Sequence, residues 1–162
     1  MPSASKRRVL SRDRLFRSRH AGYNKNHMLM IKTSVKPSSL EGLGLFADEK
    51  IKKGASVWKF DPRFDIIFDP QEFEKIEPLQ KALIDRYAYL SIETKKYIYC
   101  IDDARFMNHS SVNNNLNVVL FPGEPETRCV ANRDIEIGEE LLINYRTFDI
   151  ADAKSKEPYL DN

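Results

Sequence analysis

The second half of the chain is a series of short strand-like segments, and this pattern constrains the fold more than any other feature. Runs rich in β-branched and aromatic residues alternate with joints of Pro, Gly, Asn and Asp, as in strands that end at turns. The segments are YAYLSI, KYIYCID, NLNVVLFPG, TRCVANRDI and EELLINYRTF. They predict a mainly β domain built from short strands.

The first half adds further strands and the one convincing helical region. MIKTSVKPS predicts a strand, and LEGLGLFADEKIKKGASVWKF predicts two more that flank a charged hairpin connection. Between Pro70 and Tyr89 apolar residues recur at intervals of three and four, which is the period of a helix. Pro78 is expected to interrupt this helix, because its ring clashes with the preceding turn. We therefore expect one short helical insertion.

Length and composition narrow the class of protein. The 162 residues suit one domain with a single core. No apolar run approaches the roughly 18 residues that a membrane-spanning helix needs, and no signal-peptide pattern opens the chain, so we expect a cytoplasmic protein, or a nuclear one in a eukaryote. Cys100 and Cys129 stand outside any metal-ligand pattern. They predict two buried thiols and no metal site, with a single disulfide as the alternative.

Charge is divided unevenly along the chain. Residues 1–27 hold eight of the 26 Lys and Arg residues but only Asp13 among the 24 Asp and Glu residues, which leaves 18 basic and 23 acidic residues for the remainder. This basic N-terminal arm has no sustained apolar period and is predicted to be disordered. It is either a contact for nucleic acid or a solvated tail. Residues 149–162 are also polar and predict a mobile C-terminal flap.

Four motifs follow one another in the remainder of the chain. They are GLGLFA at 42–47, RFMNHSS at 105–111 with Asn114 behind it, IEIGEEL at 135–141, and INY ending at Tyr145. In this order they resemble the SET-domain family of protein lysine methyltransferases. The resemblance covers Met30 to Phe148, and the chain looks like a compact member without the zinc-binding pre-SET and post-SET flanks.

The resemblance implies a fold and a cofactor. The expected fold is a mainly β SET-domain (β-clip) fold over residues 28–148, with several small sheets, a threaded pseudoknot and a short helical insertion. The implied cofactor is S-adenosyl-L-methionine. Asn108 and His109 would bind it and pin the threaded crossing, while Arg105 would pair either with the cofactor carboxylate or with a buried acid. The full set of implied cofactor contacts is Leu43, Gly44, Leu45, Arg105, Phe106, Asn108, His109 and Tyr145.

The same resemblance assigns the reaction to Tyr145, with Tyr87 as a second catalytic residue. The Tyr145 hydroxyl would orient the methyl group and the lysine nitrogen, since positioning is the main resource for this transfer. The lysine must first lose a proton, because its solution pKa is near 10.4. A tyrosine oxygen or a water chain is expected to accept that proton, and no Asp or Glu in the motifs is an evident base.

An aromatic channel is expected to hold the lysine side chain, and the C-terminal flap at 149–162 is expected to act as its lid. The channel residues implied are Phe60, Tyr99, Ile143 and Phe148. Phe60 stands where the family usually has a tyrosine, and Ile143 stands where Phe or Tyr is frequent. The smaller Ile143 would leave more room around the amine, which favours higher methylation states.

The negative charge of the region after the arm favours a basic protein substrate, of the histone, histone-like or ribosomal class. Three other classes of function fit parts of the sequence. They are a SET-like module that binds cofactor or peptide without turnover, a nucleic-acid-binding protein that works through its basic arm, and a non-enzymatic β-clip domain. The retained Tyr145 argues against the first, and the tandem Asn108 and His109 argue against the last.

Overall fold

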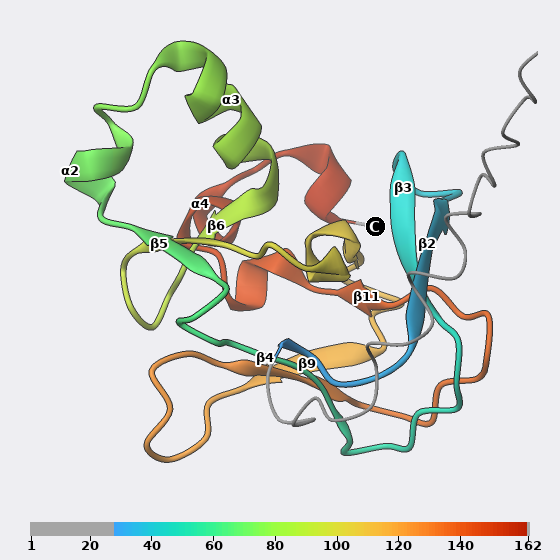
Figure 1. The fold of residues 1–162 in the computed structure, drawn as a ribbon. Coiled ribbons are helices and arrows are strands. Elements are labelled where there is room, and N and C mark those ends of the chain that lie inside the picture. Colours follow the sequence, from blue (N-terminus) through green and yellow to red (C-terminus); the bar gives the residue numbers. More distant parts are fainter. Residues whose placement is uncertain (1–27, 162) are drawn as a thin grey trace, which may run out of the picture.

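The computed structural model describes residues 28–161, so the basic arm predicted at residues 1–27 lies outside the described residues. The described part is mainly β, as predicted, and holds three sheets (Figure 1). The six-stranded sheet has the order β1 (Met28–Leu29), β4 (Ser56–Lys59), β10 (Arg128–Ala131), β9 (Leu116–Val119), β11 (Leu142–Ile143) and β8 (Asn108–His109). The others are β2 (Thr33–Pro37) with β3 (Leu43–Ala47), and β5 (Ile66–Phe68) with β7 (Tyr97–Tyr99) and β6 (Ala88–Leu90).

The helical insertion lies between β5 and β6 and is broken where the sequence predicts. Helix α2 (Pro70–Phe73) ends before Pro78, which opens α3 (Pro78–Tyr87). The ring of Phe73 is fully buried and stacks on Tyr97 with centroids 4.1 Å apart. The apolar period of α3, however, does not mark a buried face: Leu79 is 82% exposed. The insertion projects from one end of the molecule (Figure 1).

The core forms where β3, β4, β9 and β10 meet. The fully buried side chains Leu45, Val57, Leu116 and Leu141 come from different parts of the chain and belong to one cluster. Burial of such apolar surface is the main stabilising contribution to a domain of this size. Cys100 and Cys129 are buried in the same cluster and are free thiols, as predicted. Within residues 28–161 no helix combines the length and the apolar character needed to cross a bilayer.

Strand β11 is threaded between two strands that precede it in the chain. It pairs in parallel with β8 on one side, through Leu142 opposite Asn108, and with β9 on the other, through Ile143 opposite Leu116. The connection between β8 and β9 therefore forms a loop through which the later strand passes. This arrangement is the threaded crossing that the sequence predicted.

The buried Asn115 side chain fixes the crossing. Its Nδ2 donates to the carbonyl of Glu140 at 2.8 Å, and its Oδ1 accepts from the amide of Leu142 at 2.9 Å, so one side chain holds the threaded segment on both sides of Leu141. The amide of Asn115 also donates to the Leu142 carbonyl at 3.1 Å. The sequence assigned the pinning role to Asn108 and His109 and missed Asn115. A buried amide that satisfies both its donor and its acceptor in this way specifies a single strand register.

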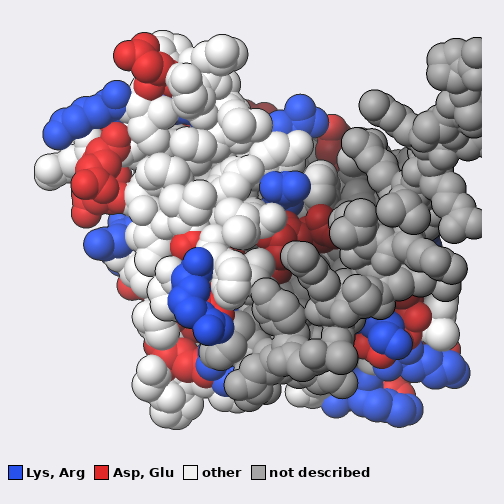
Figure 2. All heavy atoms as spheres, in the orientation of Figure 1, with Lys and Arg blue, Asp and Glu red and all other residues white. Residues whose placement is uncertain are grey.

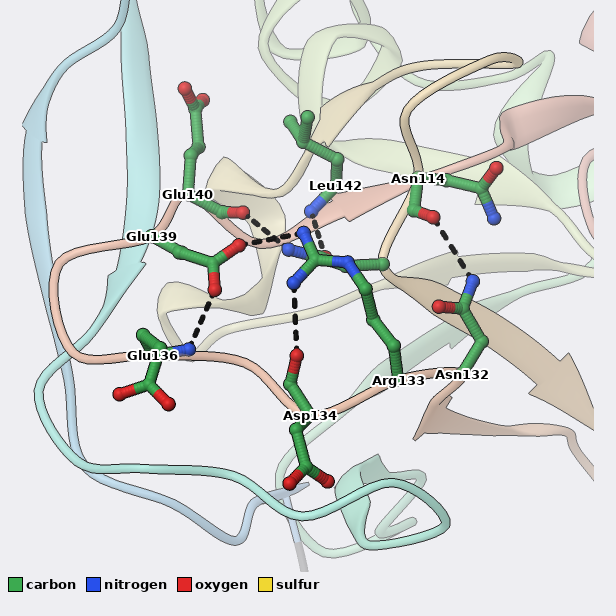
Figure 3. A network of polar contacts seen from close by, with 9 residues as sticks. Asn114, Asn132, Arg133, Asp134, Glu136, Glu139, Glu140 and Leu142 are labelled. Carbon is green, nitrogen blue, oxygen red and sulfur yellow. Dashed lines mark hydrogen bonds and ion pairs between the residues drawn. The ribbon is translucent and has the colours of Figure 1, made fainter.

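The turn before β11 is tightened by a second set of contacts. Gly138 has a φ of +88°, a conformation that favours glycine. Arg133 bridges this turn by donating to Glu139 at 2.6 Å, and Glu139 accepts from the amide of Glu136 at 2.6 Å (Figure 3). These bonds deliver residues 140–145 to the crossing in a fixed orientation.

Candidate active site

Two cavities lie beside the threaded crossing. The larger has a volume of about 370 Å³ and is walled by α3, β6, β10 and the C-terminal segment. The smaller, of about 350 Å³, is lined by Leu40, Glu41, Asn108, His109, Tyr145 and Tyr159. Tyr145 and Tyr159 belong to both walls, so the two cavities lie on either side of these rings.

Tyr145 is held rigidly between the two cavities. It follows β11 and opens the short 3₁₀ helix η2 (Tyr145–Thr147). Its hydroxyl donates to the carbonyl of Met107 at 2.6 Å, and its amide donates to Nδ1 of His109 at 3.0 Å. Burial raises the pKa of Tyr145 far above the ordinary value for a phenol. The phenol therefore keeps its proton at neutral pH and donates a hydrogen bond to the Met107 carbonyl. Acceptance of the lysine proton by a tyrosine oxygen or a water chain stays a prediction.

His109 joins three parts of the chain. It is 7% exposed, its Nδ1 accepts from the Tyr145 amide, and its Nε2 lies 3.2 Å from the carbonyl of Leu160. These contacts require a neutral ring with the hydrogen on Nε2. Burial also lowers the pKa of His109, which favours the neutral form. Both ring nitrogens are used within the protein, so His109 presents only its ring to the smaller cavity.

Asn108 ties the glycine-rich turn to the crossing. Its Nδ2 lies 3.1 Å from the carbonyl oxygens of Glu41 and Leu43 and 2.8 Å from Oε1 of Glu140. The other carboxylate oxygen of Glu140 accepts from the Ser38 hydroxyl at 3.0 Å. Glu140 thus links the start of the β2–β3 turn to Asn108 of β8, and Asn108 bonds the end of that turn. The sequence did not indicate this role of Glu140.

Gly44 is glycine because of Glu140. A Cβ atom placed on Gly44 would lie 2.1 Å from Oε1 of Glu140, well inside van der Waals contact. The φ angle of Gly44 is not in the left-handed region, so the backbone itself does not require glycine. The sequence attributed the glycine to close approach of a cofactor. The structure adds the contact with Glu140 as a second reason, and the close approach of a cofactor stays a prediction. Residues 43–45 lie in β3 and are outside the lining of the smaller cavity.

The predicted channel and catalytic residues divide into two groups. Tyr87, Arg105, Ile143 and Phe148 line the larger cavity. Phe60, Tyr99 and Phe106 are outside both linings. Phe60 is 6% exposed and belongs to the core cluster, while Tyr99 and Phe106 contact the ring of Tyr87 edge-on at 6.5 and 5.9 Å. These two rings pack against the ring of Tyr87 and help to hold it in the wall of the larger cavity.

Arg105 lies in the larger cavity, away from the Asn108 side where the sequence placed it. Its guanidinium lies over the rings of Tyr87 and Phe106, at 5.6 and 5.1 Å from their centroids. Within residues 28–161 its Nε has no hydrogen-bond partner, and no carboxylate forms an ion pair with it. No acid in the described part of the chain lies within ion-pair distance of Arg105, and its pairing with the cofactor carboxylate stays a prediction.

The C-terminal segment is folded and completes both walls. It forms α4 (Ile150–Lys154) and the 3₁₀ helix η3 (Pro158–Asp161), and Leu160 is fully buried. Arg146 anchors the end by donating to the Leu160 carbonyl at 3.0 Å. Tyr159 donates to Asp152 at 2.8 Å and lines both cavities. Figure 1 shows this segment, in red, returning between the helical insertion and the β2–β3 hairpin. In the sequence, only the apolar pair Tyr159 and Leu160 indicated that this segment packs against the rest of the domain.

Carboxyl groups from two elements line the larger cavity. They are Asp85 of α3 and Asp149 and Asp152 of the C-terminal segment. Burial raises the pKa of Asp149 to about 6, and Asp149 also caps α4 by accepting from the amide of Ala151 at 2.7 Å. The cavity therefore combines aromatic walls with negative charge, which suits an elongated cation with an apolar stem.

Comparison with known proteins connects this geometry to a family. The family model described as the SET domain matches residues 42–146. N-lysine methyltransferase KMT5A-A from Danio rerio is 32% identical in an alignment of 117 positions, and the match covers 65% of this chain and 32% of the relative. The chain thus spans about a third of the length of the curated relative that it matches.

Solved structures share the fold. A humanized mutant of the Chaetomium thermophilum Polycomb Repressive Complex 2 is 23% identical, with 73% of this chain and 15% of that chain covered and a TM-score of 0.52. The structure described as ctPRC2 in an autoinhibited conformation bound to S-adenosylmethionine is 24% identical, with coverage of 73% and 16% and a TM-score of 0.54. These likenesses confirm the predicted fold class.

Proposed function

The chain belongs to the SET-domain family, and we propose that it transfers a methyl group from S-adenosylmethionine to the side-chain amine of a lysine in a basic protein. One observation supports this proposal most strongly: Tyr145 stands in the wall of both cavities. A residue in that position touches a cofactor on one side and a substrate side chain on the other. The curated relative carries the name of an N-lysine methyltransferase.

The smaller cavity fits the cofactor. S-adenosylmethionine, when bound, would supply a methyl group on a positively charged sulfur. The cavity of about 350 Å³ offers the aromatic rings of Tyr145 and Tyr159, the apolar Leu40 and the carboxylate of Glu41. Rings and a carboxylate suit an adenosine base, its hydroxyl groups and a cationic centre. Asn108 and the Glu140 carboxylate would hold the wall that carries residues 40–43 in place.

The larger cavity fits a lysine side chain. Tyr87, Tyr89, Ile143 and Phe148 provide apolar walls for the methylene stem. The protonated hydroxyl of Tyr145, fixed by the Met107 carbonyl, would orient the reacting groups without any covalent step on the protein. Ile143 is 3% exposed and smaller than an aromatic residue, which supports the expectation of more than one methyl per amine.

A basic protein is the proposed substrate, of the histone, histone-like or ribosomal class. Asp85, Asp149 and Asp152 face the cavity that would receive it. Residues 28–162 hold 23 acidic and 18 basic residues, and both signs are interspersed on the face shown in Figure 2. Charge complementarity between such a surface and a Lys/Arg-rich segment speeds association and favours basic partners. A substrate of this class would place the protein in the cytoplasm, or in the nucleus of a eukaryote.

The test is transfer of labelled methyl from S-adenosylmethionine to a panel of basic proteins, with wild type and Tyr145→Phe compared. We expect label on lysine, and a loss of about 10²–10³-fold in kcat in the variant, because one positioned hydroxyl group at the reacting centre is removed. Cofactor affinity, measured by calorimetry, is expected to change little. Cofactor binding without transfer to any protein would instead support a binding module.

A further inference from the structure

Among residues 28–161, two buried polar groups without partners lie in and behind one wall of the larger cavity: Trp58 lines the cavity, and Glu126 lies behind Thr127. Trp58 is 3% exposed, and its indole Nε1 has no hydrogen-bond partner within residues 28–161. Glu126 is 2% exposed, and its Oε2 likewise has none in that part of the chain. One group is a donor and the other is an acceptor. Buried polar groups are nearly always paired, so two orphans of opposite type point to a small ligand between them.

The β4–β10 pairing brings these groups to one wall. Trp58 lies opposite Cys129 in the antiparallel register, and Trp58, Cys129 and Thr127 all line the larger cavity. Glu126 is held directly behind Thr127: its Oε1 accepts from the Thr127 amide at 2.8 Å and from the Thr127 hydroxyl at 3.1 Å. The two bonds to Oε1 fix the orientation of the carboxylate, and Oε2 can accept a hydrogen bond from another partner.

Glu126 is not paired with a cation in the described part of the chain. Within residues 28–161 no Lys, Arg or His lies within 4.0 Å of its carboxylate, whereas Glu124, two residues earlier, is paired with Lys59 and Arg128. A buried carboxylate without a counter-charge is costly to the fold. The chain keeps one behind the wall of a cavity that, under the proposed function, receives a lysine ammonium. That ammonium is the missing cation.

The groups that surround this wall supply no positive charge either. They are Asp65 before β5, Tyr89 of β6, Cys100 and Asp102 after β7, and Cys129 of β10. Burial raises the pKa of Asp65 to about 7, which shows how poorly the interior solvates negative charge. The two arginines of the cavity, Arg86 and Arg105, lie over the ring of Tyr87. Its other carboxyl groups, Asp85, Asp149 and Asp152, lie in α3 and the C-terminal segment.

We propose that Glu126 accepts the proton of the substrate ammonium through water held between its free carboxylate oxygen and the indole N–H of Trp58. This inference rests on the proposed function. The water gives one proton to the carboxylate and takes one from the ammonium, which leaves a neutral amine beside Tyr145 and a neutral Glu126. The proton passes to solvent after the product has left. We assign the proton to Glu126 and not to Tyr145, because the Tyr145 hydroxyl is already bonded to the Met107 carbonyl.

The kinetic test compares wild type, Glu126→Gln and the control Glu124→Gln over a range of pH. Glu126→Gln keeps the size of the side chain and removes the proton acceptor. We expect its kcat to fall about 10²-fold near neutral pH and to recover as pH rises, since solvent then removes the proton. KM and the calorimetric affinity for S-adenosylmethionine stay within about twofold, and Glu124→Gln keeps the wild-type pH profile. A wild-type profile in Glu126→Gln overturns the inference.

A second measurement needs no turnover. Trp58 is the single tryptophan of the chain, so its fluorescence reports on this site alone. We expect the emission of Trp58 in Glu126→Gln to differ from that of wild type and of Glu124→Gln, because the water that joins the indole N–H to residue 126 loses its carboxylate partner. Identical emission spectra in all three proteins contradict the assignment, even where the variant is too unstable for kinetics.

Trp58→Phe examines the donor end of the water site, with an expected loss of about tenfold in kcat at unchanged cofactor affinity. Wild-type rates in both Trp58→Phe and Glu126→Gln overturn the inference and leave the proposed function standing. Absence of any methyl transfer by wild type refutes the proposed function, and the role of Glu126 falls with it.

Discussion

Gly44→Ala should disturb the candidate site through Glu140. The added methyl would lie 2.1 Å from Oε1 of Glu140, where ordinary contact needs 3.4 Å or more, so the carboxylate must move by more than an ångström. Such a movement breaks the 2.8 Å contact with Asn108 and the 3.0 Å bond from Ser38. Hydrogen bonds to a charged group contribute about 1.5–3 kcal/mol each, and Glu140 is only half-buried, so we expect a loss of about 3 kcal/mol.

A double-mutant cycle separates this cause from a clash with the cofactor. Glu140→Ala removes the atom that the new methyl meets, so Gly44→Ala should cost under about 1 kcal/mol in that background. Unfolding in urea measures stability, and calorimetry measures the affinity for S-adenosylmethionine. The double variant should bind the cofactor no more weakly than Glu140→Ala alone. An equal cost of Gly44→Ala in both backgrounds, or a further loss of affinity in the double variant, would refute the reasoning.

Three further expectations concern the interior, the tail and the cavity. The pKa of Asp65 is about 7 in the folded state against 3.8 in the unfolded state, so the stability that its protonated carboxyl contributes is fully present below pH 3.8 and is lost as pH rises through 7. Asp65→Asn should therefore raise the free energy of unfolding by up to about 4 kcal/mol at pH 8 and leave it unchanged at pH 3. Urea midpoints at the two pH values measure this difference. Leu160→Ala should lower stability by about 2–5 kcal/mol, and an unchanged melting temperature would mean that the tail separates independently. Ile143→Phe should shift products toward monomethyl-lysine by mass spectrometry, and an unchanged product distribution would exclude Ile143 as the limit on amine size.

The sequence could predict the class of fold because the relevant signals are local. Strand alternation, the break before Pro78 and the order of the motifs each depend on a few neighbouring residues, and the structure follows them. Helical period also located α3, but period shows only that a face is apolar. It cannot show that Leu79 would have nothing to pack against, because this depends on where the insertion is attached.

The site was harder to predict because its contacts join distant positions. Ser38 and Glu140 are separated by 102 residues, and no sequence pattern near either residue indicates that they are in contact. Asn115 follows a motif that drew attention to its neighbours, yet its role depends on a strand that arrives 27 residues later. Glu126 lies in a polar stretch without any motif. Only the structure shows that it is buried and that its Oε2 has no hydrogen-bond partner within residues 28–161. Sequence patterns locate elements, while pairing between elements needs the fold.

Threading of β11 between β8 and β9 also sets the stage of synthesis at which the two cavities can form. During synthesis the loop from 108 to 116 leaves the ribosome before residues 141–145, so neither cavity can have its Tyr145 wall until the last part of the chain is made and has passed into place. Long-range insertions of this kind slow folding, since the closing segment must find a loop that is already formed. A nascent or truncated chain that ends before Tyr145 therefore lacks one wall of both cavities.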